Sequence, residues 1–293
     1  MKTLNFLFFI SILLLLSSCE DVIQVTLDQG ASQLTVDGWI TDQAGVQTIR
    51  LIKTKPYFDN SPANPANNAS VKVTDSDGMV YDFTDSKGDG NYTWTPKNNE
   101  KIGKIGKTYT LNINFEGESY QAVTKIGRVP AIDSIGYEFQ EKTLQFSKEG
   151  YLANFYATEP KGSGDCYRIK SYRNGVLNNK IRDIVIAYDA GTSDGANTDG
   201  ILYILPLRRS ISRPDSLYQV GETVKVELLS ITEDAFYFFS EARNQLNNGG
   251  LFARPPANVR TNIKNVNPNG KKATGYFGAS AVSTSQITIQ KRK

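Results

Sequence analysis

Carboxylates, serines and lysines are the residue types left for catalysis in this chain, because it contains no histidine. Without imidazole, the Ser-His-Asp and Cys-His triads, histidine acid/base catalysis and zinc sites that need histidine are excluded. A carboxylate pair, a Ser-Lys arrangement or an oxygen-ligated metal remains. The chain has 30 Asp and Glu residues, but no spacing among them selects a catalytic pair. We therefore expect a protein that is not an enzyme and carries no cofactor.

Cys19 is the residue whose chemistry is best defined by its neighbours. It follows Leu16-Ser17-Ser18, and an apolar run from Phe6 comes after the basic start Met1-Lys2. A basic start, a short apolar core and small residues are the parts of a secretory signal, and the run is shorter than the roughly 20 residues of a membrane span. The motif resembles the bacterial lipobox, in which a peptidase cuts before a lipid-modified cysteine. We expect residues 1–18 to be a signal peptide and Cys19 to be lipidated.

Cys166 is the second of the two cysteines. Lipidation of Cys19 leaves it without an intramolecular disulfide partner, although an exported protein meets conditions that permit disulfides. It lies in Cys166-Tyr167-Arg168-Ile169, which alternates like a strand. We expect a small buried apolar side chain rather than a nucleophile.

Two acidic turns are the candidates for a metal site. Residues 85–90, Asp-Ser-Lys-Gly-Asp-Gly, resemble half of a calcium loop, but Lys87 stands where a ligand should be. Asp75 with Asp77 is the second candidate. Because Asp and Gly are also common residues of turns, turn chemistry explains both clusters without a metal. We expect no metal.

Aromatic residues in loops are the candidates for contact with a glycan or peptide ligand. Tyr57 and Phe58 lie in residues 55–68, whose three prolines exclude a central strand. We predict a partner or ligand contact there, and the alternative is a loop folded onto its own domain. Trp39 and Trp94 are further candidates, although the alternation around Trp94 favours a position in a sheet.

The elements that must position these residues are mostly strands. Fifteen Tyr, fourteen Phe and 24 Gly favour a mainly β protein. Residues 19–32 are expected to be a lipidated tether, and residues 33–128 an immunoglobulin-like β-sandwich of short strands separated by turn signals. The expected strands cover residues 34–40, 48–52, 71–73, 79–83, 92–94, 109–115 and 120–126.

The second half is expected to be a β-rich C-terminal domain, residues 129–293, with one amphipathic helix. A capping box at Ser230-Ile231-Thr232-Glu233, followed by helical spacing, predicts the helix at about 231–247. Its aromatic run Phe236-Tyr237-Phe238-Phe239 is expected to pack on a sheet. The polar stretch 189–200 is expected to be a mobile loop. The expected strands cover residues 134–140, 150–158, 166–174, 181–188, 201–208, 222–229 and 284–291.

Four pieces of sequence carry a family resemblance. They are residues 19–21 leading to 34–40, residues 106–111 with 120–122, the helix at 230–246, and residues 252–259 with 261–263 and 275–280. Through them, nearly all of the mature chain resembles a family of Bacteroidota lipoproteins catalogued as domain of unknown function 4249. The last piece is the most specific, because a Gly-x-x-Tyr-x-Leu pattern such as that of the second also fits the turn and pleat of unrelated sandwiches.

The resemblance implies a lipoprotein anchored by acyl chains in the outer membrane, a companion of TonB-dependent transporters. It carries no catalytic residue over to this chain. Glu20-Asp21, directly after Cys19, is similar to a surface-export signal of such bacteria, so the protein is expected to face the cell exterior.

Two Asp-Ser-hydrophobe triplets resemble the O-glycosylation signal of Bacteroidota secretory proteins. They place the candidate modified hydroxyls at Ser134 and Ser216. About one such triplet is expected by chance in a chain of this length, so the motif alone is weak.

Three functions are compatible with these features. The first is a non-enzymatic accessory lipoprotein that binds a substrate or partner for a TonB-dependent transporter. The second is a structural or adhesive surface lipoprotein, and the third is a surface hydrolase that works through carboxylates. The net charge of +3 is too mild to indicate a nucleic-acid partner.

Overall fold

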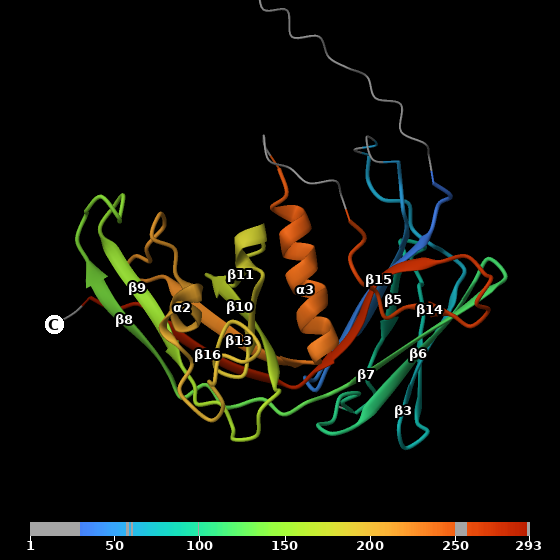
Figure 1. The fold of residues 1–293 in the computed structure, drawn as a ribbon, viewed down its shortest axis with the longest axis horizontal. Helices are drawn as coiled ribbons and strands as arrows, with labels where there is room; N and C mark the ends of the chain where they lie inside the picture. Colours follow the sequence, from blue (N-terminus) through green and yellow to red (C-terminus); the bar gives the residue numbers. More distant parts are fainter. Residues whose placement is uncertain (1–29, 57–58, 60, 99, 250–256, 292–293) are drawn as a thin grey trace, which may run out of the picture. The chain divides into compact units, whose positions relative to one another are not determined.

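The computed structural model of the chain describes residues 30–56, 59, 61–98, 100–249 and 257–291. Within them the fold is mainly β, as alternation and composition predict (Figure 1). The described residues from Ser32 onward form one compact unit. In the described part, the chain has no helix with the length and apolar character needed to span a membrane.

The first seven strands occupy the positions that the sequence predicts. They form most of two sheets that pack as a sandwich, in the orders β15-β1-β2-β5 and β14-β7-β6-β3-β4. The strands are β1 (Leu34–Thr41), β2 (Gln47–Lys53), β3 (Ser70–Asp75), β4 (Val80–Phe83), β5 (Asn91–Trp94), β6 (Thr108–Phe115) and β7 (Glu118–Lys125).

The sandwich also takes two strands from the far end of the chain, β14 (Lys264–Asn265) and β15 (Ala273–Ser280). β15 runs parallel to β1 along its whole length, and β14 pairs with β7. Gly275 has a φ of +87°, and a Cβ there would lie 2.0 Å from the carbonyl oxygen of Val36. Only glycine therefore permits this approach of β15 to β1. The strands of the sandwich thus extend beyond the boundary predicted at residue 128.

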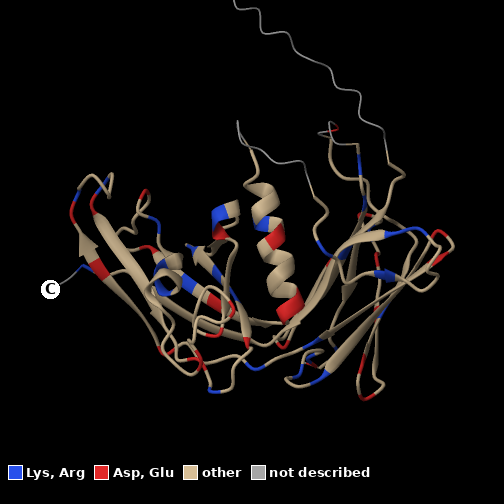
Figure 2. Cartoon of the chain, viewed as in Figure 1, with Lys and Arg blue, Asp and Glu red and all other residues tan. Residues whose placement is uncertain are grey.

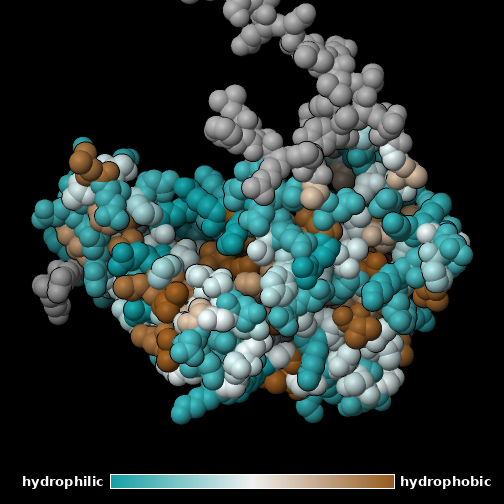
Figure 3. All heavy atoms as spheres, in the orientation of Figure 1, coloured by the Kyte–Doolittle hydropathy of each residue, from teal (hydrophilic) through white to brown (hydrophobic). Residues whose placement is uncertain are grey.

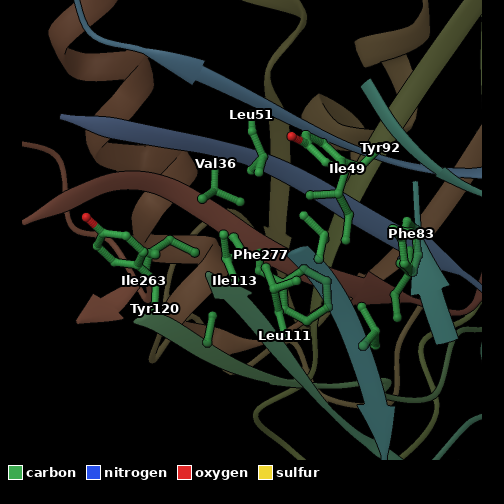
Figure 4. Packing of buried hydrophobic residues seen from close by; sticks show 14 of the residues in the cluster. Val36, Ile49, Leu51, Phe83, Tyr92, Leu111, Ile113, Tyr120, Ile263 and Phe277 are labelled. Atoms are coloured by element: carbon green, nitrogen blue, oxygen red, sulfur yellow. The ribbon is translucent and has the colours of Figure 1, made fainter. Parts of the chain in front are cut away.

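One apolar core fills the space between the two sheets (Figure 4). Because side chains alternate along a strand, every second residue of β1, β2, β6 and β7 points into it. Full burial of each large apolar side chain contributes about 1.5–3 kcal/mol. The late segment is part of this core through Ile263 and Phe277, both buried. Other members shown are Val36, Ile49, Leu51, Phe83, Tyr92, Leu111, Ile113 and Tyr120.

A third sheet, in the order β11-β10-β13-β16 with β12 also paired to β10, forms the centre of the second half, beside the two-stranded sheet β8-β9. Five of the strands predicted here are present, as β8 (Ser134–Gln140), β9 (Gly150–Tyr156), β10 (Cys166–Arg173), β13 (Thr223–Ile231) and β16 (Val282–Thr288). The third sheet also contains β11 (Val176–Leu177) and β12 (Val185–Tyr188).

The predicted strand at 201–208 is wrong. The chain instead forms a short helix α2 (Leu205–Arg208), followed by a 3-10 turn η2 (Arg209–Ile211). Pro206 lies in the first turn of α2, where its fixed φ suits a helix and its missing N–H costs nothing. The predicted strand at 181–188 is right only in its second half, because a 3-10 turn η1 (Ile181–Asp183) precedes β12.

The predicted helix is present as α3 (Glu233–Leu246), but its cap is Thr232 rather than Ser230. Thr232 Oγ1 accepts a hydrogen bond from the N–H of Ala235 at 3.2 Å. Ser230 is instead a buried residue of β13, and its hydroxyl accepts the N–H of Ala281 at 2.9 Å. Strand pairing therefore continues further into the predicted cap than the local pattern shows.

Candidate functional site

Three of the residues predicted to have a function lie outside the described residues. These are Cys19, for lipidation, and Tyr57 and Phe58, for ligand contact. Both sites remain predictions.

The two candidate glycosylation hydroxyls are exposed on different elements. Ser134 is the first residue of β8. Ser216 borders a surface hollow of about 700 Å³, and its Oγ accepts a hydrogen bond from Arg173 at 2.8 Å. Two charged residues that line the hollow already form ion pairs within the protein: Arg173 with Glu222, and Asp215 with Arg182.

The two acidic turns are organised by hydrogen bonds of the protein itself. The carboxylate of Asp85 accepts four backbone N–H groups, those of residues 87–90, at 2.8–3.3 Å. Lys107 Nζ lies between Asp75 and Asp77, at 2.6 and 2.7 Å from their oxygens. The described residues contain no group of three or more acids or cysteines placed to hold a metal. Turn chemistry accounts for the geometry of both clusters.

Cys166 is buried, as predicted, and its pKa fits the expected inert role. Burial raises the pKa of the thiol to about 12. The nucleophilic thiolate is therefore scarce at neutral pH.

Glu159 is the most deeply buried acid of the described residues, with 2% of its surface exposed. Its carboxyl group accepts hydrogen bonds from the Gly200 N–H at 2.6 Å and the Tyr167 hydroxyl at 3.3 Å. Burial, together with a contact to Asp165 and the charge of Asp189, raises the pKa of this carboxyl from 4.5 to about 7. Such a shift is typical of a functional acid or of a structural cluster.

The partners of this cluster favour the structural interpretation. Arg128 Nε donates to Asp165 at 2.6 Å, and the buried carboxylate of Asp189 accepts the N–H groups of Gly164 and Asp165 at 2.8 and 3.0 Å. These bonds tie the stretch 189–200, expected to be mobile, to the neighbouring loop. Because a catalytic carboxyl must reach its substrate, the buried Glu159 cluster does not provide the open pair that a hydrolase needs.

Helix α3 packs its aromatic residues on the third sheet, as predicted. Phe236 and Phe239 are buried there, and Phe238 stacks on Tyr276 of β15 at 4.7 Å between ring centroids. Trp39, considered an exposed contact residue, instead lies 5.5 Å from the ring of Phe239 and is half-buried. Gly278 leaves room for it, since a Cβ there would lie 2.2 Å from the Trp39 ring.

Arg168 and Lys170 are half-buried cations on the α3 side of β10. The guanidinium carbon of Arg168 lies 4.3 Å from the centroid of the Phe239 ring. The Nε of Arg168 is buried without a hydrogen-bond partner, and among the described residues neither cation forms an ion pair. Burial lowers the pKa of both side chains, and in Lys170 the charge of Arg168 lowers it further.

The sequence contains a signal for this pair, although we did not predict a site there. Residues 166–173 alternate, so Arg168 and Lys170 must share the face opposite Tyr167 and Ile169. The pattern cannot show which face a helix covers, and exposed cations on a strand are ordinary.

The described chain thus combines a mainly β scaffold, a sandwich completed by its own late strands, and a half-buried cation pair beside an aromatic helix. Basic and acidic positions are interspersed along it (Figure 2). Residues 20–286 match the family model described as "Domain of unknown function (DUF4249)". The chain belongs to this family, as its sequence pattern suggests.

Further comparisons add little. No curated protein matches the chain. Among solved structures it is similar to a two fibronectin type-III domain segment from chicken tenascin, with 13% sequence identity, 68% of this chain and 89% of that chain covered, and a TM-score of 0.19.

Proposed function

We propose that this chain is a non-enzymatic, lipid-anchored protein of the outer membrane that binds a substrate or partner for a TonB-dependent transporter at the cell surface. The observation that carries the binding role is the half-buried pair Arg168 and Lys170, which has no ion-pair partner among the described residues. Because burying an unpaired charge costs several kcal/mol, a fold keeps such groups where an external partner compensates for that cost.

The anchoring role rests on the sequence. Cys19 follows a secretory signal and a lipobox-like Leu16-Ser17-Ser18. Two or more acyl chains make a stable anchor. A tethered protein needs little affinity of its own to stay near a membrane partner, because tethering raises the effective concentration. Weak binding by a scaffold without catalytic groups is therefore sufficient for an accessory role.

The test is co-purification from the native host. A tagged chain, extracted in mild detergent, is expected to carry a TonB-dependent transporter with it. The matched control is Cys19→Ser, which is expected to leave the membrane fraction and lose the transporter. Recovery of the membrane-bound, tagged chain without any transporter would contradict the accessory role. Normal growth of a deletion strain on every nutrient, combined with poor attachment to surfaces, would favour the adhesive alternative.

A further inference from the structure

Two arginines stack on aromatic rings of the same helix. Arg260 lies over Tyr237 at 4.8 Å, and Arg168 lies over Phe239 at 4.3 Å, each measured from the guanidinium carbon to the ring centroid. Stacking uses the flat face of a guanidinium group, so its N–H donors remain free around the edge. The two sites therefore begin with the same geometry and the same set of donors.

At Arg260 those donors are satisfied by the protein. Nε and Nη2 donate to one carboxylate oxygen of Glu241 at 2.9 and 2.7 Å, and the backbone N–H of Arg260 donates to the other oxygen at 2.8 Å. Asp234 adds a longer contact of 3.4 Å. A stacked arginine on this helix thus takes a carboxylate at its edge.

At Arg168 no carboxylate of the described residues forms an ion pair with the guanidinium group. The two acids whose charges act on this cation pair are Asp37 and Glu227. Glu227 is already bound by the Tyr172 hydroxyl at 2.6 Å and by Lys225 at 2.6 Å. Asp37, an exposed residue of β1, forms no ion pair within 4 Å in the described part of the chain. The donors of Arg168 therefore have no acceptor among the described residues.

Lys170 strengthens the electrostatic case. It lies two residues further along β10 on the same face, about 6.5 Å away by strand geometry. Arg168 and Lys170 each keep part of their side chain exposed, so a ligand has a route to them. The sheet pairs neighbouring cations without difficulty, as Lys225 with Glu227 and Arg173 with Glu222 show. Within this sheet, Arg168 and Lys170 are adjacent and form no ion pair among the described residues, which creates a local positive potential next to an aromatic surface.

We propose that Arg168 and Lys170 bind an oxyanion of the ligand, a carboxylate or phosphate group, which takes the role that Glu241 has at Arg260 but contacts the terminal Nη donors of Arg168, since its Nε is buried. Arg168 donates to the oxyanion from the edge of its stacked guanidinium, and Lys170 adds a point charge. Phe239 holds the guanidinium plane in place and shields one of its faces from water. Asp37 acts against binding through its negative charge. The inference adds a ligand class to the proposed binding function.

The test uses the full chain in detergent, with thermal unfolding followed as either inorganic phosphate or acetate is raised at constant ionic strength. The wild type is expected to show a saturable rise in the midpoint temperature. Arg168→Gln with Lys170→Met should raise the half-saturating concentration at least about tenfold, while Asp37→Asn should lower it. Phosphate alone, acetate alone or both acting would identify the preferred oxyanion.

Matched controls remove other charges of the same kind. Arg260→Gln removes a stacked arginine that already has a partner, and Lys225→Met removes a paired lysine from the neighbouring strand. Both are expected to keep the response of the wild type. No saturable response to either ion in the wild type, or an equal response in the double variant, would overturn the inference. Because no transporter is present, that failure is distinct from a failure of the co-purification.

Discussion

The two sides of helix α3 treat the same chemical group in opposite ways. On one side, Arg260 stacks on Tyr237 and binds Glu241. On the other, Arg168 stacks on Phe239 beside Lys170, and the fold supplies no carboxylate. A cation such as Arg260, which forms an ion pair within the protein, needs no external partner. A desolvated cation without an ion-pair partner reduces stability, and this difference is the basis on which we propose an external ligand at Arg168 and Lys170.

Glu159 is an ionisable group that the fold itself encloses. Its folded-state pKa of about 7 is above its ordinary value of 4.5. The proton is therefore held more tightly in the folded than in the unfolded chain. The contribution of this group to stability is fully present below pH 4.5 and is lost as the pH rises to about 7.

The largest predicted effect follows from that titration. Between pH 4.5 and 7.5 the wild type should lose on the order of 3 kcal/mol of unfolding free energy relative to Glu159→Gln. The amide keeps an acceptor for the Gly200 N–H but has no proton to lose. Urea unfolding of both proteins across this pH range measures the difference. Parallel profiles would show that Glu159 does not titrate in the fold.

Lys170→Met should stabilise the protein without ligand, by about 1 kcal/mol, because it replaces an unpaired desolvated cation with an apolar side chain of similar length. Urea unfolding at neutral pH gives the change. A less stable variant would mean that the fold itself pairs Lys170, and the contrast between the two sides of α3 would disappear.

Thr232→Ala should lower the unfolding free energy by about 1 kcal/mol, because it removes the side-chain acceptor of the Ala235 N–H at the start of α3. The matched control is Thr232→Ser, which keeps the hydroxyl and should remain close to the wild type. Since α3 covers Arg168, the alanine variant should also weaken the response to phosphate or acetate. An unchanged stability would place the cap elsewhere.

Arg260→Gln should have the smallest effect, a loss of about 0.5 kcal/mol, because its ion pair with Glu241 is partly exposed to solvent. Arg168→Gln is expected to change stability in the opposite direction. Chemical unfolding of the two variants compares them directly. The same sign in both would remove the distinction between a paired and an unpaired arginine.

Most local elements could be predicted because their signals are local. Alternation identified the first seven strands, and helical spacing with a capping pattern identified α3. β15 was missed because Gly275 and Gly278 weaken its strand pattern. Each glycine is required by a contact with a segment that is distant in sequence. Gly275 accommodates the backbone of β1, and Gly278 accommodates the ring of Trp39. The strand predicted at 201–208 is wrong because the prediction gave the apolar content of this segment more weight than the helix-starting role of Pro206.

The surface shows the same limit of prediction from local sequence. Large apolar side chains such as Ile201, Leu202 and Leu205 are exposed at 44%, 39% and 53%, and the space-filling view shows hydrophobic areas interrupted by hydrophilic ones (Figure 3). These residues lie in the predicted strand at 201–208, and their apolar character could not show their exposure, because burial depends on what the rest of the chain covers.

The sequence by itself determined the absence of histidine chemistry, the mainly β class and the aromatic helix, because each depends on composition or on neighbours within a few residues. The export signal with its lipobox-like cysteine stays a prediction of the same local kind. Only the tertiary structure decided that residues 264–280 complete the N-terminal sandwich, that Glu159 is enclosed with other acids, and that α3 covers the face of Arg168 and Lys170. These outcomes depend on contacts between segments up to 241 residues apart, and pairing or desolvation of a charge is a property of those contacts.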